Sequence, residues 1–192
     1  MDRQLMFVLG GARSGKSTYA QDWAQQHGRE VLFVATAQAY DDDMRQRIAR
    51  HRSDRPAHWH TLEAPLNVVD AIRAQPQPYD TVVIDCLTLL ASNVLLSLPE
   101  DADQDAVNEA VLAEVDALLN TYATSSASWL IVSNEVGMGV VPPTRLGNLF
   151  RDALGRANQR LASQAHQVVL LVAGLPWHLK GAPTERTESS SK

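Results

Sequence analysis

The chain has 192 residues, a length that favours one α/β domain over two, and its formal charge of −5 gives no global basic surface, so we expect no nucleic-acid partner. Its single cysteine, Cys86, excludes an internal disulfide and favours a reducing compartment. The apolar start is too short for a signal peptide, and polar residues interrupt the apolar stretch 81–98, so we expect a cytoplasmic protein without a membrane span.

The first predicted element is a buried strand at residues 5–9, an apolar run bounded by glycines. A helix is predicted over residues 16–26, with Gly28 as its C-terminal cap. The segment that joins the strand to the helix fits the pattern G-x-x-x-x-G-K-[ST]. It consists of Gly10, Gly11, Ala12, Arg13, Ser14, Gly15, Lys16 and Ser17.

This loop has the residue types that a bound triphosphate requires. Glycines let the backbone wrap closely, so that its N–H groups converge on phosphate oxygens, and the following helix adds its positive N-terminal end. Lys16 supplies a mobile positive charge for the outer phosphates, and the Ser17 hydroxyl suits Mg²⁺. A glycine-rich turn without a ligand is the structural alternative, but the strand before it and the helix after it favour nucleotide binding.

A second strand is predicted at residues 30–36, and residues 41–52 follow with acidic side chains first and basic ones last. That order suits a helix dipole, and Met44, Ile48 and His51 would share one face of such a helix. His51 is therefore either a structural histidine at the edge of the core or a group that reacts with phosphate. The neighbouring arginines favour a neutral imidazole, which is the nucleophilic form.

A third strand at residues 82–84 ends at Asp85, whose carboxylate is the kind of hard oxygen ligand that Mg²⁺ prefers. We expect this strand end to lie beside the phosphate loop, so that Ser17 and Asp85 share the metal of a bound triphosphate. Asp85 could also cap the helix predicted from Leu87 onward, and the two roles are compatible.

Two helices and two strands complete the pattern. Strands are predicted at residues 129–133 and 168–173. Apolar side chains recur three and four residues apart in each helix, namely Val107, Val111, Val115, Leu118 and Tyr122 in the first and Leu146, Phe150, Leu154, Ala157 and Leu161 in the second. Strands that alternate with helices predict an α/β fold of the P-loop NTPase type, with a mostly parallel central sheet, helices on both faces, and ligands at the carboxyl ends of the strands.

Several longer stretches resemble one enzyme family. They are GGARSGKS at 10–17, VATAQ at 34–38, DDDMRQRIARHRSDRPAHW at 41–59, IDCLT at 84–88, NEVGMGVVP at 134–142 and FRDALGRANQRLA at 150–162. The phosphate loop is common to many families, but R-I-x-x-H-x-x-x-R-P-x-x-W together with N-E-V-G-M-G is much more specific. On these residues the chain resembles the bifunctional adenosylcobinamide kinase/adenosylcobinamide-phosphate guanylyltransferase family of cobalamin synthesis.

The resemblance implies an enzyme with two steps. ATP or GTP phosphorylates the terminal hydroxyl of adenosylcobinamide, and GTP then gives its GMP part to that phosphate through a histidine, releasing pyrophosphate. It also implies a homotrimer with sites near the subunit boundaries. A small-molecule kinase that uses only the phosphate loop, and a nucleotide-dependent switch protein, are the alternatives, and neither needs a covalent histidine.

The resemblance also assigns roles residue by residue. The nucleophile falls on His51. Lys16 is the second catalytic group and Ser17 and Asp85 are the Mg²⁺ ligands on the loop and strand-end patterns given above. Nucleotide contacts outside the phosphate loop fall on Ala35, Thr36, Ala37, Arg52, Ser53, Asp54, Arg55, Glu63 and Asp85. Residues 134–139 either contribute to the site or form a structural turn at a subunit contact.

Residues 1–180 are expected to form the single nucleotide-binding domain, and residues 181–192 a disordered tail, because the tail has no apolar residue larger than Ala or Pro.

Deletion of residues 181–192 should therefore leave the melting temperature of the protein nearly unchanged, as measured by differential scanning calorimetry. A large fall in the melting temperature would mean that the tail packs against the domain.

Overall fold

The computed structural model describes residues 3–38, 55–76 and 78–181. Its strands are β1 (Leu5–Gly10), β2 (Val31–Ala35), β3 (His60–Glu63), β4 (Thr81–Asp85), β5 (Ser128–Asn134), β6 (Gln167–Val172) and β7 (Leu175–Lys180). Its helices are α1 (Lys16–His27), α3 (Val68–Arg73), α4 (Leu87–Ser97), α5 (Gln104–Thr124) and α6 (Arg145–Gln164). All five strands predicted from apolar runs are present, each within two residues of its predicted bounds.

The strands form one seven-stranded sheet in the order β3-β2-β4-β5-β1-β6-β7. Every neighbouring pair is parallel except β6 and β7, which are antiparallel, so the predicted mostly parallel sheet is confirmed. β5 lies between β1 and β4, so the strand that ends at Asp85 is separated by one strand from the strand that leads into the phosphate loop. Sequential order along the chain does not determine which strands are neighbours in a sheet.

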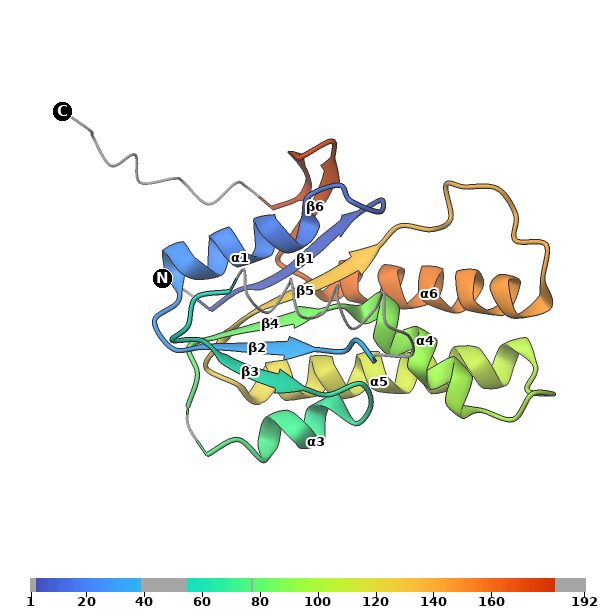
Figure 1. The fold of residues 1–192 in the computed structure, drawn as a ribbon, viewed down its shortest axis with the longest axis horizontal. Coiled ribbons are helices and arrows are strands. Elements are labelled where there is room, and N and C mark those ends of the chain that lie inside the picture. The colour runs from blue at the N-terminus through green and yellow to red at the C-terminus, as the bar shows by residue number, and fades with distance from the viewer. Residues whose placement is uncertain (1–2, 39–54, 77, 182–192) are drawn as a thin grey trace.

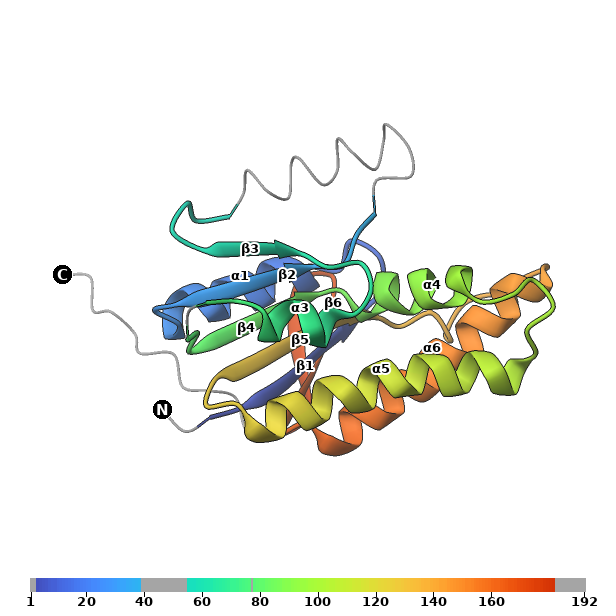
Figure 2. The same cartoon turned by 90° about the horizontal axis from the view of Figure 1, so that it is seen from below.

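Helices cover both faces of the sheet, as predicted, and each face has its own apolar core. Met6 and Val8 of β1 pack with Trp23 of α1 on one face. Phe7 and its neighbours on the other face pack with α3, α4, α5 and α6. Figures 1 and 2 show α1 on one side of the sheet and α5 and α6 side by side on the other.

The structure adds elements that the apolar runs do not reveal. β3 and β7 are edge strands and are largely exposed, so neither has the continuous apolar sequence of a central parallel strand. The predicted apolar stripe of α5 is confirmed, since all five of its residues are buried. In α6 the last three predicted residues are buried, but Leu146 is half exposed and Leu149 takes the core position instead.

Gly28 does end α1, but with an extended backbone instead of the left-handed one that usually favours glycine in a C-terminal cap. Space explains the residue: a Cβ here would lie 2.7 Å from Val31 Cγ2 and 2.9 Å from the Ala24 carbonyl oxygen. The missing side chain therefore lets α1 end close against β2.

None of the helices in residues 3–38, 55–76 and 78–181 is both long and apolar enough to cross a membrane.

Two Gly→Ala variants should distinguish the effect of close packing on the stability of the protein from the effect of backbone conformational entropy. Gly28→Ala should destabilise the protein by about 1–3 kcal/mol, because the added methyl clashes with the backbone of α1. Gly155→Ala, inside α6 where a Cβ meets no atom within 4 Å, should stabilise it by about 0.5–1 kcal/mol. Urea unfolding curves measure both, and a Gly28→Ala protein as stable as the parent would contradict the packing explanation.

Candidate nucleotide site at the carboxyl edge of the sheet

The register of the sheet brings the predicted strand-end residues to one edge. Ala35, the last residue of β2, lies opposite both Glu63 of β3 and Asp85 of β4. Gly10, the last residue of β1, lies opposite Asn134 of β5 and Leu171 of β6. The carboxyl ends of parallel strands therefore form a continuous rim, which is where ligands bind in open α/β sheets.

The phosphate loop leaves this rim and turns into α1. Arg13 and Gly15 have positive φ angles of 56° and 97°, and the Ser14 N–H donates to the Gly11 carbonyl over 3.3 Å. Gly15 occupies the N-cap position, and no side chain caps the helix. The first N–H groups of α1 thus have no capping side chain, which suits an anion at the positive end of the helix.

Lys16 places its positive charge against the same loop. The residue is only 8% exposed, and its Nζ donates to the Gly11 carbonyl oxygen over 2.6 Å. A buried ammonium group strongly favours anionic partners. The loop therefore presents backbone N–H groups and a cation together, the two features that recognise a polyphosphate.

Neighbouring elements hold the loop in this shape. The Glu135 N–H, just after β5, donates to the Gly10 carbonyl over 3.1 Å, and the Gly174 N–H, in the turn between β6 and β7, donates to the Ser14 carbonyl over 3.0 Å. Gly10 has a φ of 154°, and a Cβ there would lie 2.5 Å from the Leu171 carbonyl oxygen, so only glycine fits. Gly174 was not predicted, because nothing in the sequence pairs that turn with the loop.

Thr36 has a structural position in this site. Its hydroxyl is fully buried, donates to the Cys86 carbonyl over 2.7 Å and accepts from the Cys86 N–H over 2.8 Å. Its own carbonyl accepts from the Asn93 side chain over 2.8 Å. Thr36 therefore joins the end of β2 to the start of α4, while its predicted neighbours Ala35 and Ala37 are buried and half-buried at the same rim.

The predicted metal ligands are both oxygen donors at this rim. Ser17 lies in the first turn of α1, and Asp85 ends β4 with a partly exposed carboxylate. Cys86, not Asp85, occupies the N-cap of α4 and makes no side-chain cap, so the helix-capping alternative for Asp85 is not what the structure has. In the described ranges no three His, Cys, Asp or Glu side chains gather into a metal site. A Mg²⁺ that arrives on phosphate oxygens needs only one or two protein ligands, and Ser17 and Asp85 are hard-oxygen donors of the required chemistry.

Cys86 is an inert group beside the rim. Burial raises the pKa of its thiol to about 11, and the neighbouring Asp85 carboxylate adds to the rise. The thiol stays protonated at neutral pH, as expected of a small buried hydrophobe, and does not act as a nucleophile.

The remaining predicted contacts divide into two groups. Glu63 is exposed at the end of β3, and the Arg55 guanidinium lies 3.7 Å above the Phe33 ring on the face that α1 covers. His51, Arg52, Ser53 and Asp54 lie outside the described residues.

A buried polar network connects the rim to α6. Ser133 Oγ donates to Asn158 Oδ1 over 2.8 Å, and the Asn158 amide donates to the Asn134 carbonyl over 3.1 Å. Thr88 at the start of α4 accepts from the Asn134 N–H over 2.7 Å. These bonds fix the position of residues 134–135, and so of the Glu135 N–H that holds Gly10.

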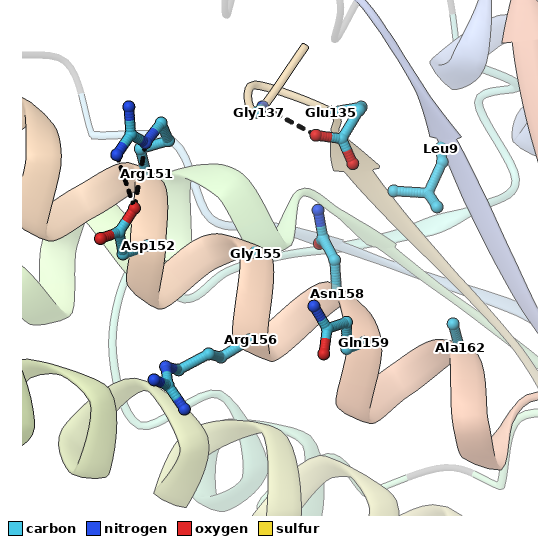
Figure 3. Close-up of a pocket in the computed structure, with 10 residues that line it drawn as sticks. All are labelled: Leu9, Glu135, Gly137, Arg151, Asp152, Gly155, Arg156, Asn158, Gln159 and Ala162. Carbon is cyan, nitrogen blue, oxygen red and sulfur yellow. Dashed lines mark hydrogen bonds and ion pairs between the residues drawn. The ribbon is translucent and has the colours of Figure 1, made fainter. Parts of the chain in front are cut away.

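A cavity of about 660 Å³ lies between the β5–α6 loop and α6. Its lining combines charged, amide and small residues, namely Leu9, Glu135, Gly137, Arg151, Asp152, Gly155, Arg156, Asn158, Gln159 and Ala162. Figure 3 shows Asn158 rising from α6 toward Glu135 and Leu9, whereas Arg156 extends away from them. The sequence indicates the segment NEVG at residues 134–137 but gives it no role. The α6 residues could not be predicted to line a site, because their polar side chains resemble an ordinary solvated helix face.

Comparison with known proteins identifies the family. The family model described as cobinamide kinase / cobinamide phosphate guanyltransferase matches residues 6–179. The chain is 39% identical to the bifunctional adenosylcobalamin biosynthesis protein CobU of Escherichia coli K12 over 92% of this chain and 99% of that protein. It is 40% identical to CobU of Salmonella typhimurium over the same shares, and 42% identical to CobP of Pseudomonas aeruginosa over 92% of this chain and 97% of that protein.

A solved structure supports the fold alone. It belongs to a study of a prototypical ATPase from the type III secretion system of pathogenic bacteria, and it matches with a TM-score of 0.57 at 12% identity over 87% of this chain and 51% of that one. The P-loop NTPase type of fold is therefore confirmed, and nucleotide substrates fit both this fold and the family's two activities. The chain belongs to the cobinamide kinase / cobinamide phosphate guanyltransferase family, and it is an enzyme of cobalamin biosynthesis that is both a kinase and a guanylyltransferase.

Proposed function

We propose that both activities start from a nucleoside triphosphate held by residues 10–17. In the kinase step, the terminal hydroxyl of adenosylcobinamide attacks the γ-phosphorus of ATP or GTP, and the nucleoside diphosphate leaves. In the second step, adenosylcobinamide phosphate receives GMP from GTP, giving adenosylcobinamide-GDP and pyrophosphate. The observation that supports this most is the loop itself, in which Lys16 is buried against a carbonyl at the open N-terminus of α1.

Lys16 and the loop have separable tasks in this proposal. The loop N–H groups orient the β- and γ-phosphates, and the Lys16 ammonium exchanges its bond to Gly11 for phosphate oxygens. Its positive charge then stabilises the negative charge that develops on the leaving group. When bound, Mg²⁺ held by Ser17 and Asp85 would neutralise further phosphate charge at the same place.

His51 is proposed as the nucleophile that carries GMP. One ring nitrogen forms a bond to the α-phosphorus of GTP, the bond from that phosphorus to the bridging oxygen breaks, and pyrophosphate leaves. A phosphate oxygen of the acceptor then attacks the same phosphorus and frees the imidazole. A phosphoramidate suits this transient role because the bond stays reactive, and arginines 52 and 55 supply compensating charge. Ala35, Thr36, Ala37, Ser53, Asp54 and Glu63 are proposed as further nucleotide contacts.

Incubation with Mg²⁺ and GTP labelled at the α-phosphate should give a base-stable, acid-labile adduct on His51. His51→Ala should lose the adduct but keep acceptor phosphorylation, because only the second step needs the imidazole. Lys16→Ala should lower both reactions by about 100-fold or more through the lost phosphate charge. His58→Ala, at an exposed histidine seven positions later in the sequence, is the matched control and should label like the parent.

Labelling of His51→Ala at the parent's level would overturn the nucleophile assignment. No adduct on any variant, with kinase activity intact, would favour the alternative of a small-molecule kinase without the transferase step.

Two exposed apolar surfaces support the proposed homotrimer. On the β5–α6 loop Met138, Val140 and Val141 are 82%, 94% and 65% exposed, and on edge strand β7 Leu175 and Trp177 are 72% and 64% exposed. They are different parts of the chain (Figure 1), and contact between two unlike surfaces of neighbouring copies produces a closed ring when the rotation fits. We also propose that residues 1–180 form a single domain and that the protein is cytoplasmic.

Val140→Asp should break the trimer into smaller species, because it places a charge in an apolar contact, and light scattering after size exclusion measures the mass. Leu96→Asp is the matched control, since Leu96 is 54% exposed on α4, outside both surfaces. A Val140→Asp protein with the same mass as the parent would exclude the loop from the contact.

A further inference from the structure

We propose that the cavity between the β5–α6 loop and α6 binds the amide-bearing edge and the hydroxyl arm of the corrinoid acceptor, with Glu135 as the base of the kinase step. This rests on the proposed function, because it places the second substrate of the same reaction. Two observations carry it: two residues of the cavity lining, Leu9 and Glu135, border the first residue of the phosphate loop, and the lining matches a ligand rich in carboxamides.

The position follows from backbone contacts. Leu9, which lines the cavity, directly precedes the phosphate loop, and the Glu135 N–H donates to the Gly10 carbonyl over 3.1 Å. A group in this cavity therefore lies next to the loop that would hold the triphosphate. The kinase reaction requires this adjacency, because the acceptor oxygen must come within about 3–3.5 Å of the γ-phosphorus.

The size and lining indicate the ligand class. A volume of about 660 Å³ lies within the range of about 300–1,000 Å³ for small-molecule sites. Gln159 brings an amide, and Asp152 and Glu135 bring carboxylates, so the lining offers both donors and acceptors to primary carboxamides. Gly155 and Gly137 leave room between them.

Glu135 is the group placed to receive the hydroxyl proton. Its Oε1 accepts from the Gly137 N–H over 2.7 Å, which orients the carboxylate and leaves Oε2 to face the acceptor. In the kinase step the hydroxyl oxygen bonds to the γ-phosphorus, the bond to the β–γ bridging oxygen breaks, and the hydroxyl proton passes to Glu135 and then to water. The guanylyl step needs no such base, because its attacking oxygen belongs to a phosphate that is already anionic.

The buried network fixes the backbone next to this base. The Asn158 amide donates to the Asn134 carbonyl over 3.1 Å and accepts from the Ser133 hydroxyl over 2.8 Å. A side chain of α6 therefore fixes the residue that precedes Glu135. The same hydrogen bonds thus connect α6, which lines the cavity, to the segment that carries Glu135.

Three measurements test the proposal: self-guanylylation with α-labelled GTP, phosphorylation of adenosylcobinamide, and guanylyl transfer to supplied adenosylcobinamide phosphate. Gly155→Leu fills the cavity with a good helix former and should raise the KM for both acceptors about tenfold or more, with self-guanylylation unchanged. Gln159→Ala should raise the same KM values about fivefold through a lost hydrogen bond, and Gln164→Ala, exposed on the same helix outside the cavity, should not.

Glu135→Gln keeps the bond to Gly137 and removes the base, so it should lower kcat of the kinase step about 100-fold or more. It should spare guanylyl transfer to the supplied phosphate, and Glu109→Gln on the exposed face of α5 is the matched control. Equal loss of both acceptor reactions in Glu135→Gln would reject the base. Unchanged acceptor KM values in Gly155→Leu and Gln159→Ala, with self-guanylylation intact, would reject the cavity. If the parent protein itself forms no guanylyl adduct, the proposed function is rejected instead.

Discussion

The anchoring of the phosphate loop is the constraint on which the site depends. A loop that offers several N–H groups to one anion has few left for its own carbonyls, so neighbouring elements satisfy two of them and the loop itself satisfies Gly11. β5 supplies the Glu135 N–H to Gly10, the β6–β7 turn supplies the Gly174 N–H to Ser14, and Lys16 covers Gly11. In the proposed function the remaining N–H groups of the loop receive the phosphates, and this anchoring holds them in place before a ligand arrives.

The same anchoring explains the arrangement around the loop. β5, inserted between β1 and β4, brings residues 134–135 directly against Gly10. Thr88 of α4 and Asn158 of α6 then support that strand end from two helices, with bonds of 2.7–3.1 Å to Asn134 and Ser133 of β5. Buried polar groups are costly unless they are paired, so such a network fixes one arrangement. The loop, the Glu135 segment and the α6 cavity behave as one unit for this reason.

Much of the fold could be predicted from sequence, because the central parallel strands are apolar runs and the two long helices keep a clear apolar stripe. β3 and β7 could not, since edge strands are exposed and lack that pattern. The strand order could not be predicted either, because apolar runs predict strands without their neighbours. In the site, the loop from Gly10 to Ser17 and Asp85 were predicted from their pattern, and Ala35 and Glu63 from the family resemblance alone. Thr36 was predicted to contact the nucleotide, and its hydroxyl is hydrogen-bonded to the Cys86 backbone. Asn158 and Gly174 make contacts with residues distant in sequence, so no local pattern indicated these two residues.

The central claim is that Lys16 exchanges the Gly11 carbonyl for phosphate oxygens when a triphosphate enters the loop. A crystal structure with a non-hydrolysable GTP analogue measures this directly. The expected result is an Lys16 Nζ that has left Gly11 and lies within about 3 Å of a β- or γ-phosphate oxygen, with backbone N–H groups of residues 11–17 on the same phosphates. A triphosphate bound elsewhere, with the 2.6 Å bond from Lys16 to Gly11 intact, would contradict it.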